Sequence, residues 1–378
     1  SNWDFSNVKS MMYMFRYCES LATLDVSNWD VSNVSSMIYM FDGCSSLTTL
    51  DVSNWNVSKV TNMRGMFANT PLDTTSYDAL LISWSQLPSL QSDVLFGANL
   101  AKYQSLGASK ARQHIIDTYG WTIADAGQTD AFTFTINTTL GTGSSFNLPL
   151  RSGYNYDMLV DWGDGNTSTV TSFDDVNKTH TYATGGTYEI KITGLCEAWY
   201  FNNGGDRLKL TSIDQWGNTG FVNMENAFFG CDKLTTVNDI DGTWCSDVTN
   251  MSNMFSGCSS LTTIDVSNWD VSNIINMYGM FGNCSSLTTI DVSNWDVSNV
   301  SNMTYMFYEC SSLTTLDVSN WDVSSVTNFN HFVFNCNSLT ALDVSSWDVS
   351  SVTNFMYFVY NCNSLTALDV SSWDVSSV

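Results

Sequence analysis

Aspartates that recur at a fixed spacing are the residues of this sequence whose side chains could bind a ligand or a cation. Two sets of aspartates recur every 26 residues, one inside the repeated segment typified by LTTLDVSNW and one directly after its tryptophan. Carboxylate oxygens are the ligands that calcium takes in proteins, so such columns predict a cation-binding face. The first set is Asp25, Asp51, Asp265, Asp291, Asp317, Asp343 and Asp369, and the second is Asp4, Asp30, Asp270, Asp296, Asp322, Asp348 and Asp374.

Two interpretations of the second set stay open, because an aspartate that follows the tryptophan can also accept backbone N–H groups at a turn. The same choice applies to the motif VDWGDGN, in which two aspartates flank a tight turn. Calcium is therefore the one cofactor that the sequence suggests, with its candidate ligands at Asp161, Asp164, Asp270, Asp296, Asp322 and Asp348.

Catalytic constellations are not recognisable in the sequence. The three histidines, His114, His180 and His331, fall in three different segments, and no Gly-rich loop of the nucleotide-binding type links a strand to a helix. A Ser/His/Asp triad or a metal site needs several such groups close together. We therefore expect a protein without enzymatic activity.

Cysteines follow the same period as the aspartates. Eight of the ten occupy one position of the repeat, including Cys258, Cys284 and Cys310, and no paired CxxC motif occurs. Stacked repeats would place neighbouring cysteines about 4.8 Å apart with parallel Cβ directions, which is poor disulfide geometry. We expect a column of buried free thiols, while Cys196 and Cys245 lie off this position and stay unassigned.

The charge balance excludes two classes of partner. The 378 residues contain 13 basic and 37 acidic side chains, which gives a net charge of −24. Nucleic acids and anionic membranes both require clusters of lysine and arginine, so neither is expected as a partner. No apolar run approaches the roughly 18 residues of a membrane span, and no direct membrane insertion is expected.

The 26-residue period itself predicts stacked repeats, and it places these residues on structural elements. Leu287, Ile290 and Val292 follow the alternation of a short strand, whereas Val300, Met303, Met306 and Phe307 have the spacing of a helical turn. No single repeat can bury its own apolar side chains, so the repeats must stack around a shared core. We expect that core to contain Trp269, Trp295, Trp321, Trp347, Cys258, Cys284 and Cys310.

Residues that alternate with the inward side chains of the strand should face outward. Stacking then builds columns of threonine and aspartate on a flat polar face, and such faces are what repeat proteins use to bind partners. The predicted partner face consists of Thr263, Asp265, Thr289, Asp291, Thr315, Asp317, Asp343 and Asp369.

The repeats occur in two groups with different segments between them. Residues 1–70 end one array, and residues 71–127, with two helical segments and a final strand, form its C-terminal cap. Residues 130–194 show short alternating runs typical of a β-sandwich. Residues 195–245 form an N-terminal cap of irregular first repeats, and a second array occupies residues 246–378. Because the sequence starts and stops inside repeats, we expect a longer polypeptide.

Two segments resemble known families. VDWGDGN, followed by HTYATGGTYEIKITG, resembles the polycystic-kidney-disease-type (PKD) domain, an immunoglobulin-like module of extracellular proteins. The 26-residue unit, with LTTLDVSNWDVSNV, resembles the BspA-like leucine-rich repeats of bacterial surface proteins. The expected fold is therefore a pair of α/β leucine-rich-repeat solenoids, with a parallel sheet and short helical returns, joined by a helical cap and an all-β Ig-like sandwich.

These resemblances imply an adhesion or recognition protein that is secreted, displayed on a cell surface or part of an extracellular appendage or virion fibre. Its partner would be a surface glycan or a protein of another cell. The alternative is a structural segment of a long appendage or fibre, bacterial or phage, whose main contacts are with further copies of itself.

Overall fold

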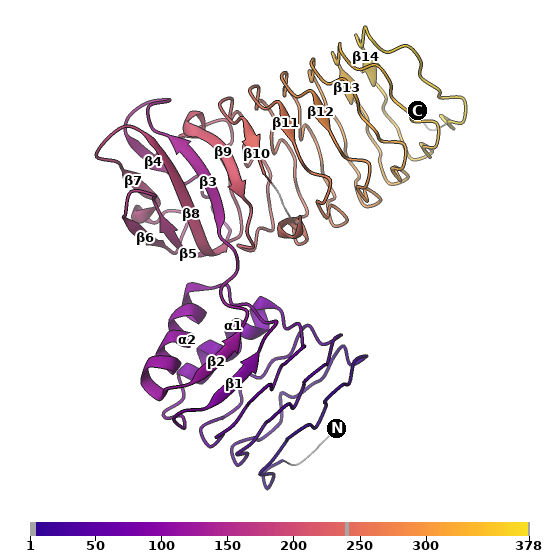
Figure 1. Ribbon diagram of the computed structural model, residues 1–378. Coiled ribbons are helices and arrows are strands. Elements are labelled where there is room, and N and C mark those ends of the chain that lie inside the picture. The colour runs from indigo at the N-terminus through magenta and orange to yellow at the C-terminus, as the bar shows by residue number, and fades with distance from the viewer. Residues whose placement is uncertain (1–4, 239–241, 377–378) are drawn as a thin grey trace. The chain divides into compact units, whose positions relative to one another are not determined.

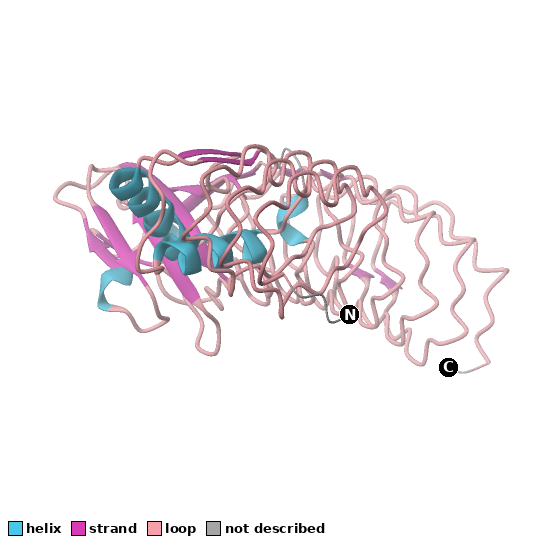
Figure 2. Cartoon of the chain, turned by 90° about the horizontal axis from the view of Figure 1, so that it is seen from below, coloured by secondary structure: helices cyan, strands magenta, loops and turns pink. Residues whose placement is uncertain are grey.

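The computed structural model describes residues 5–238 and 242–376 (Figure 1). The chain divides into two compact units, Ser1–Thr129 and Asp130–Val378, which are described separately. Most of both units consists of loops and turns, with few regular elements (Figure 2).

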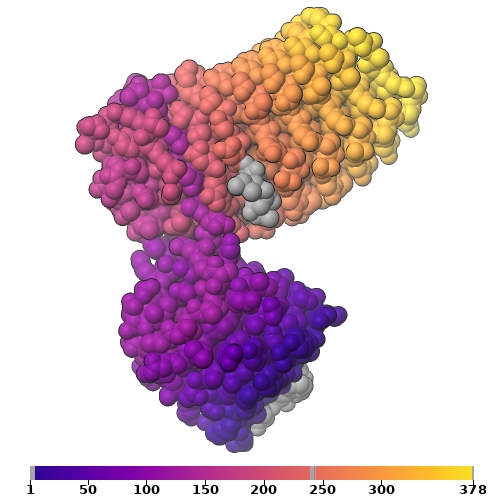
Figure 3. Space-filling view, in the orientation of Figure 1, coloured from indigo at the N-terminus to yellow at the C-terminus, as the bar shows by residue number. Residues whose placement is uncertain are grey.

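The 26-residue repeats stack as successive coils, each coil being one repeat. Isolated parallel bridges join equivalent asparagines of neighbouring coils from Asn250 through Asn276, Asn302 and Asn328 to Asn354. Each asparagine also bonds its own turn, as when Asn302 Oδ1 accepts the amide of Thr304 at 3.0 Å. On the surface the coils appear as successive bands, orange to yellow (Figure 3).

The segment expected to be a helical return is a series of turns. Alternate amides donate within the coil and to the next one: Met306 N–H donates to Met303 O at 3.2 Å, and Phe307 N–H donates to Phe332 O at 3.0 Å. A helix would direct all these amides to carbonyls four residues earlier in the chain. Tyr305 and Glu309 moreover have φ of 59° and 57°, a left-handed conformation that interrupts any helix.

The predicted fold class is therefore wrong. The described residues contain only two α-helices, neither in a repeat, and their strands form small separate sheets instead of one continuous parallel sheet. Each repeat contributes at most a two-residue strand, since its polar residues close turns on both sides. These short strands are β11 (Thr263–Ile264), β12 (Thr289–Ile290), β13 (Val333–Phe334) and β14 (Val359–Tyr360), paired as β11–β12 and β13–β14.

Unit 1 ends in a helical segment that covers the last coil. Helix α1 (Thr74–Ser85) begins at Asp73, whose side chain accepts the Ser76 amide, and α2 (Leu106–Tyr119) ends at Gly120 with φ of 68°. Both helices predicted within residues 71–127 are thus present. Strands β1 (Leu95–Ala98) and β2 (Thr122–Asp125) pair in parallel, and Phe96 bridges to Met63 of the last coil.

Unit 2 begins with a sheet that extends into its repeats. The six-stranded sheet has the order β10-β9-β3-β8-β5-β6, and its strands are β3 (Phe132–Asn137), β5 (Tyr156–Asp161), β6 (Thr167–Val170), β8 (Thr187–Cys196), β9 (Leu210–Gln215) and β10 (Thr236–Val237). β4 (Ser145–Asn147) pairs separately with β7 (Thr179–Thr181). Because β3 pairs with both β8 and β9, the strands of residues 130–194 are not a self-contained sandwich.

Short 3-10 helices complete unit 2 at Val176–Lys178, Arg207–Lys209 and Thr243–Cys245. A single hydrophobic core runs from Phe132 on β3 to Phe358 in the last coils. No helix among the described residues is long and apolar enough to cross a membrane.

Candidate functional site

The predicted Thr/Asp face lies along β10, β11 and β12 of unit 2. Thr289 and Asp291 are exposed, whereas Ile290 between them is buried, as the alternation predicts. Their coils form a groove of about 660 Å³ that spans four successive repeats. Of the predicted partner face, this groove includes Thr263, Asp265, Thr289, Asp291, Thr315 and Asp317; Asp343 and Asp369 lie on later coils, outside its lining.

One part of this groove was missed in the sequence. Thr236, Val237 and Asn238 occupy the positions that Thr263, Ile264 and Asp265 occupy in the following coil, with an offset of 27 instead of 26. That extra residue hides the equivalence, although the Thr-Val-Asn triplet itself was a signal. The irregular first coil thus contributes polar side chains to the same groove.

The equivalent positions of unit 1 form a second groove of the same kind. It measures about 440 Å³ and includes the Thr23–Asp25 and Thr49–Asp51 segments, with Ser76 of α1 at its end. The lining of both grooves contains aspartates and no lysine or arginine. The polar groove is therefore a property of the repeat and not of one place in the chain.

The groove aspartates are held by their own turns. Asp291 Oδ1 accepts the Ser293 amide at 3.1 Å and the Ser293 hydroxyl at 2.7 Å, and no bond to its Oδ2 is found among the described residues. Asp51 has the same contacts with Ser53, whose side chain and backbone lower the pKa of this carboxyl. One oxygen of each carboxylate thus fixes the turn, and the arrangement suits acceptance of hydroxyl or cationic donors.

The second aspartate set forms the same turn on a different part of the coil. Asp296 Oδ1 accepts the Ser298 amide at 3.1 Å and its hydroxyl at 2.6 Å, and these bonds lower the pKa of Asp296. Asp270, Asp322 and Asp348 bond Ser272, Ser324 and Ser350 alike. In unit 1, Asn56 stands at this position and accepts the Ser58 amide at 3.1 Å. Asp4 lies outside the described residues.

These bonds are the ones expected if the aspartates of the second set close turns, and they are not the contacts of a metal site. Among the residues that the structure describes, no group of three or more His, Cys, Asp or Glu side chains is arranged to hold a metal ion.

The aspartates of VDWGDGN also serve a turn. Asp161 Oδ1 accepts the Gly163 amide at 3.0 Å, and Asp164 Oδ1 accepts the Asn166 amide at 3.1 Å. The second oxygen of Asp164 lies 2.7 Å from His180 Nε2, and the His180 ring stacks on Trp162 at 5.1 Å. Burial opposes ionisation of Asp164, but the bonds to His180 and Asn166 together lower its pKa. Asp164 is therefore occupied by protein partners.

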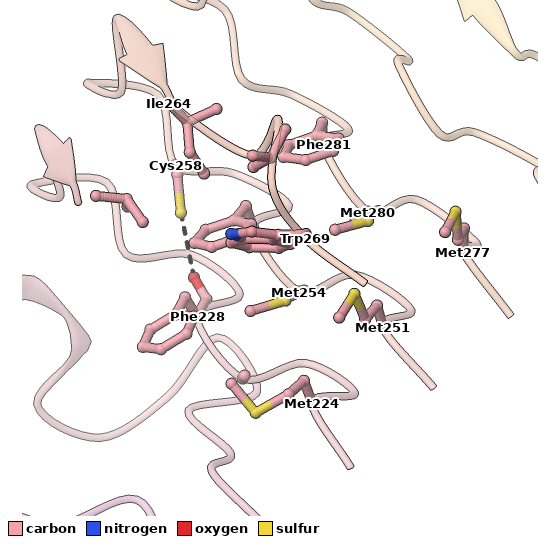
Figure 4. Close-up of a cluster of buried hydrophobic side chains, with 14 of the residues drawn as sticks. Met224, Phe228, Met251, Met254, Cys258, Ile264, Trp269, Met277, Met280 and Phe281 are labelled. Atoms are coloured by element: carbon pink, nitrogen blue, oxygen red, sulfur yellow. Dashed lines mark hydrogen bonds between the residues drawn. The ribbon is translucent and has the colours of Figure 1, made fainter. Parts of the chain in front are cut away.

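The cysteine and tryptophan columns connect each coil to the one before it. Cys258 Sγ donates to Phe228 O at 3.3 Å (Figure 4), and Cys284 and Cys310 donate to Phe255 and Phe281 at 3.2 and 3.1 Å. Trp295, Trp321 and Trp347 donate Nε1–H to valine carbonyls at 2.9–3.0 Å. The Trp295 and Trp321 rings stack at 6.4 Å, and Trp269 joins the same column.

All ten cysteines have free thiols, and most are buried. Burial raises the pKa of Cys258 and of Cys310 well above the ordinary value, and that of Cys284 to about 12. Neutral thiols are poor nucleophiles and poor metal ligands, so these groups act as small apolar donors. Cys196 and Cys245, unassigned in the sequence, are likewise buried donors, to Ala198 O and to Gly242 O.

Comparison with known proteins gives one result. A family model described as "Mycoplasma protein of unknown function, DUF285" matches residues 1–102, 222–341 and 282–378. No curated protein and no solved structure matches the chain. The family model says nothing of BspA-like repeats or of a PKD-type module, which stay predictions. The matched ranges cover more than half of the 378 residues and include the repeats of both units, with the first part of the cap, so the chain belongs to the DUF285 family.

Proposed function

We propose that this protein is a non-enzymatic extracellular recognition protein that binds a cell-surface glycan or protein of another cell through its repeat surface. One observation supports this proposal above the others: the same Thr/Asp positions form a groove in both units. If these polar side chains served only to close turns, they would not need to line a groove.

The chemistry of the groove supports partners that donate hydrogen bonds. Threonine hydroxyls and aspartate carboxylates line it without any basic residue, so sugar hydroxyls and the lysines or arginines of a protein are suitable donors. The repeat resembles modules of bacterial surface proteins, and residues 130–194 resemble a module of extracellular proteins; both resemblances support a location outside the cell, on its surface or on an appendage.

The test is binding of the full chain to a glycan array and to intact cells. The double variant Asp291→Asn/Asp317→Asn changes two groove carboxylates, and we expect it to lose about tenfold or more in affinity, since charge-assisted hydrogen bonds are lost. Asp296→Asn/Asp322→Asn is the matched control, because it removes the same charge and alters the same serine turns outside the groove. Asn238 and Asn56 show that asparagine is accepted at both positions.

Two outcomes would count against the proposal. Equal losses in the two double variants would make the effect one of net charge or stability. Absence of any ligand, together with regular self-association of the chain, would favour the structural segment of an appendage instead.

A further inference from the structure

A second kind of pocket lies in unit 1, at the junction between the last coil and the cap. It measures about 320 Å³, at the lower end of the range of small-ligand sites, and differs in chemistry from the Thr/Asp grooves. Its walls are the ring of Tyr39 and the side chains of Arg64, Leu95 and Ala124, and Asn99 and Thr122 are polar residues of its lining.

One wall of the pocket is the end of an aromatic column. Tyr13 and Tyr39 occupy equivalent positions of successive coils and stack with ring centroids 5.8 Å apart at 12°. The next equivalent residue is Gly65, so no third ring continues the column. A Cβ built on Gly65 would lie 2.3 Å from Tyr39 Cε1, which shows that the Tyr39 ring already packs on the backbone of this glycine. Tyr39 is half-buried, and the part of it that stays exposed lines the pocket beside Gly65.

The floor of the pocket is bare backbone. Gly97 of β1 packs directly on Gly65, since a Cβ on Gly97 would come within 2.6 Å of Gly65 N. Any larger residue at either position would therefore fill part of the space or move the strand. Leu95 beside it is 45% exposed, so its side chain presents apolar surface to the pocket. The floor and walls thus offer apolar surface to a ring.

The pocket has a positive charge and no negative one. Arg64 is exposed, and no ion pair with it is found among the described residues. Arg16, whose guanidinium lies 5.0 Å from the centroid of the Tyr39 ring, is instead paired with Asp42 at 2.8 Å. No carboxylate lines the pocket, although acidic residues outnumber basic ones 37 to 13 in the chain and aspartates line both Thr/Asp grooves. An unpaired guanidinium here favours an anionic ligand, and its planar donors match a carboxylate.

We propose that this pocket binds a sugar ring that bears a carboxylate, such as a hexuronic acid unit of an acidic glycan. The C–H face of the ring would pack on Leu95 beside the exposed part of Tyr39, and the carboxylate would pair with Arg64. Asn99 Oδ1 already accepts the Asn69 amide at 2.8 Å, so its amide nitrogen is the group that can donate to ring hydroxyls. This site is independent of the proposed recognition groove, since it involves other residues and the opposite charge.

The test compares two ligands that differ in one group. D-glucuronic acid and D-glucose share the ring, and only the first has a carboxylate. Both are titrated at millimolar concentrations against the full chain by ligand-observed NMR. We expect D-glucuronic acid to bind and D-glucose to bind at least about tenfold more weakly, because the ion pair with Arg64 is missing.

Matched variants locate the site. Arg64→Gln should weaken D-glucuronic acid about tenfold or more, while Lys110→Gln, which removes the same charge from exposed α2, should leave it unchanged. Ala124→Leu should block the pocket, whereas Ala126→Leu, exposed on the same segment but outside the lining, should not. Equal binding of both sugars, no binding of either, or full binding by Arg64→Gln would each overturn the proposal. A failure of the Thr/Asp groove variants would leave it intact.

Discussion

At the scale of single residues, the buried thiols act as hydrogen-bond donors between coils. Phe281 O accepts both the Cys284 amide at 3.2 Å and the Cys310 thiol at 3.1 Å, so the thiol adds to a bond that the turn already makes. In unit 1, Thr70 takes the cysteine position, and its hydroxyl donates to Phe41 O at 2.5 Å. The position thus requires a small donor and not sulfur chemistry.

Substitution of Cys310 tests this role. Cys310→Ala should lower the free energy of unfolding by about 1–2 kcal/mol through a small cavity and a lost donor, and Cys310→Ser should stay within about 1 kcal/mol of wild type. Chemical denaturation measures both. Cys18→Ala, at the exposed member of the column, is the control and should change stability by less than about 0.5 kcal/mol. A serine variant less stable than the alanine variant would contradict this role.

At the scale of the element, each coil is a set of turns fixed by side chains. The left-handed positions of the coil are occupied by glycine or asparagine in many repeats, as at Gly257 and Asn283, but by Glu309 in another. An ordinary residue pays about 1–2 kcal/mol for this conformation. The conformation is therefore imposed by the stack, through bonds such as Glu309 N–H to Phe334 O at 2.7 Å.

The Asp–Ser turns make the repeats sensitive to acid. Bonds from serine side chains and amides lower the pKa of Asp296 and of Asp348 below the value near 3.9 of an unfolded chain. A group with a lowered folded pKa stabilises the fold above the unfolded value, and this stability is lost as pH falls through the folded pKa. The melting temperature should therefore decrease as the pH is lowered below about 4.

An asparagine variant identifies these carboxylates as the cause. Asp296→Asn/Asp348→Asn keeps an acceptor but cannot titrate, so its melting temperature should fall less between about pH 5 and about pH 3 than that of wild type. Glu19→Gln/Asp117→Asn serves as the control, because it also removes two carboxylates but alters no Asp–Ser turn. Asp117, for example, accepts a bond from the side chain of Gln113 outside the repeats. Identical acid sensitivity in all three proteins would show that these turns are not the titrating groups.

At the scale of the whole molecule, unit 2 is one continuous core. Trp216, directly after β9, stacks on Trp244 at 4.0 Å and on Phe132 of β3 at 5.9 Å, and its edge contacts Phe228 of the first coils. The sheet and the repeats therefore share side chains as well as strand pairing. Arg151 adds a polar link, since it pairs with Glu225 at 2.8 Å and lies over the Tyr200 ring.

This continuity predicts how damage spreads. In the full chain, Trp216→Ala should reduce hydrogen-exchange protection in β3 and in the first coils together, with an effect that declines toward residues 340–376, because coils contact mainly their neighbours. Trp347→Ala is the matched control and should act on the late coils while β3 keeps its protection. Loss confined to one side of Trp216 would contradict a shared core.

The period, the inward side chains and the outward polar columns all follow from the order of residues alone. Trp321, Cys310 and Ile290 are buried and Thr289 and Asp291 exposed, as the alternation predicts, because burial follows from spacing alone. The helices of residues 71–127 were also predictable, since end signals such as Gly120 act locally.

Tertiary structure decided what the backbone of each repeat does. Met303, Met306 and Phe307 have helical spacing, yet their amides bond alternately within the coil and to the next coil. A sequence pattern indicates which side chains point inward, but it does not indicate which carbonyls the backbone amides donate to. Here the carbonyls of the neighbouring coil compete with those of a helix for the same amides. The extension of β3 into β9 and the pocket above Gly65 and Gly97 depend likewise on segments distant in sequence. Only stacking brings those segments together.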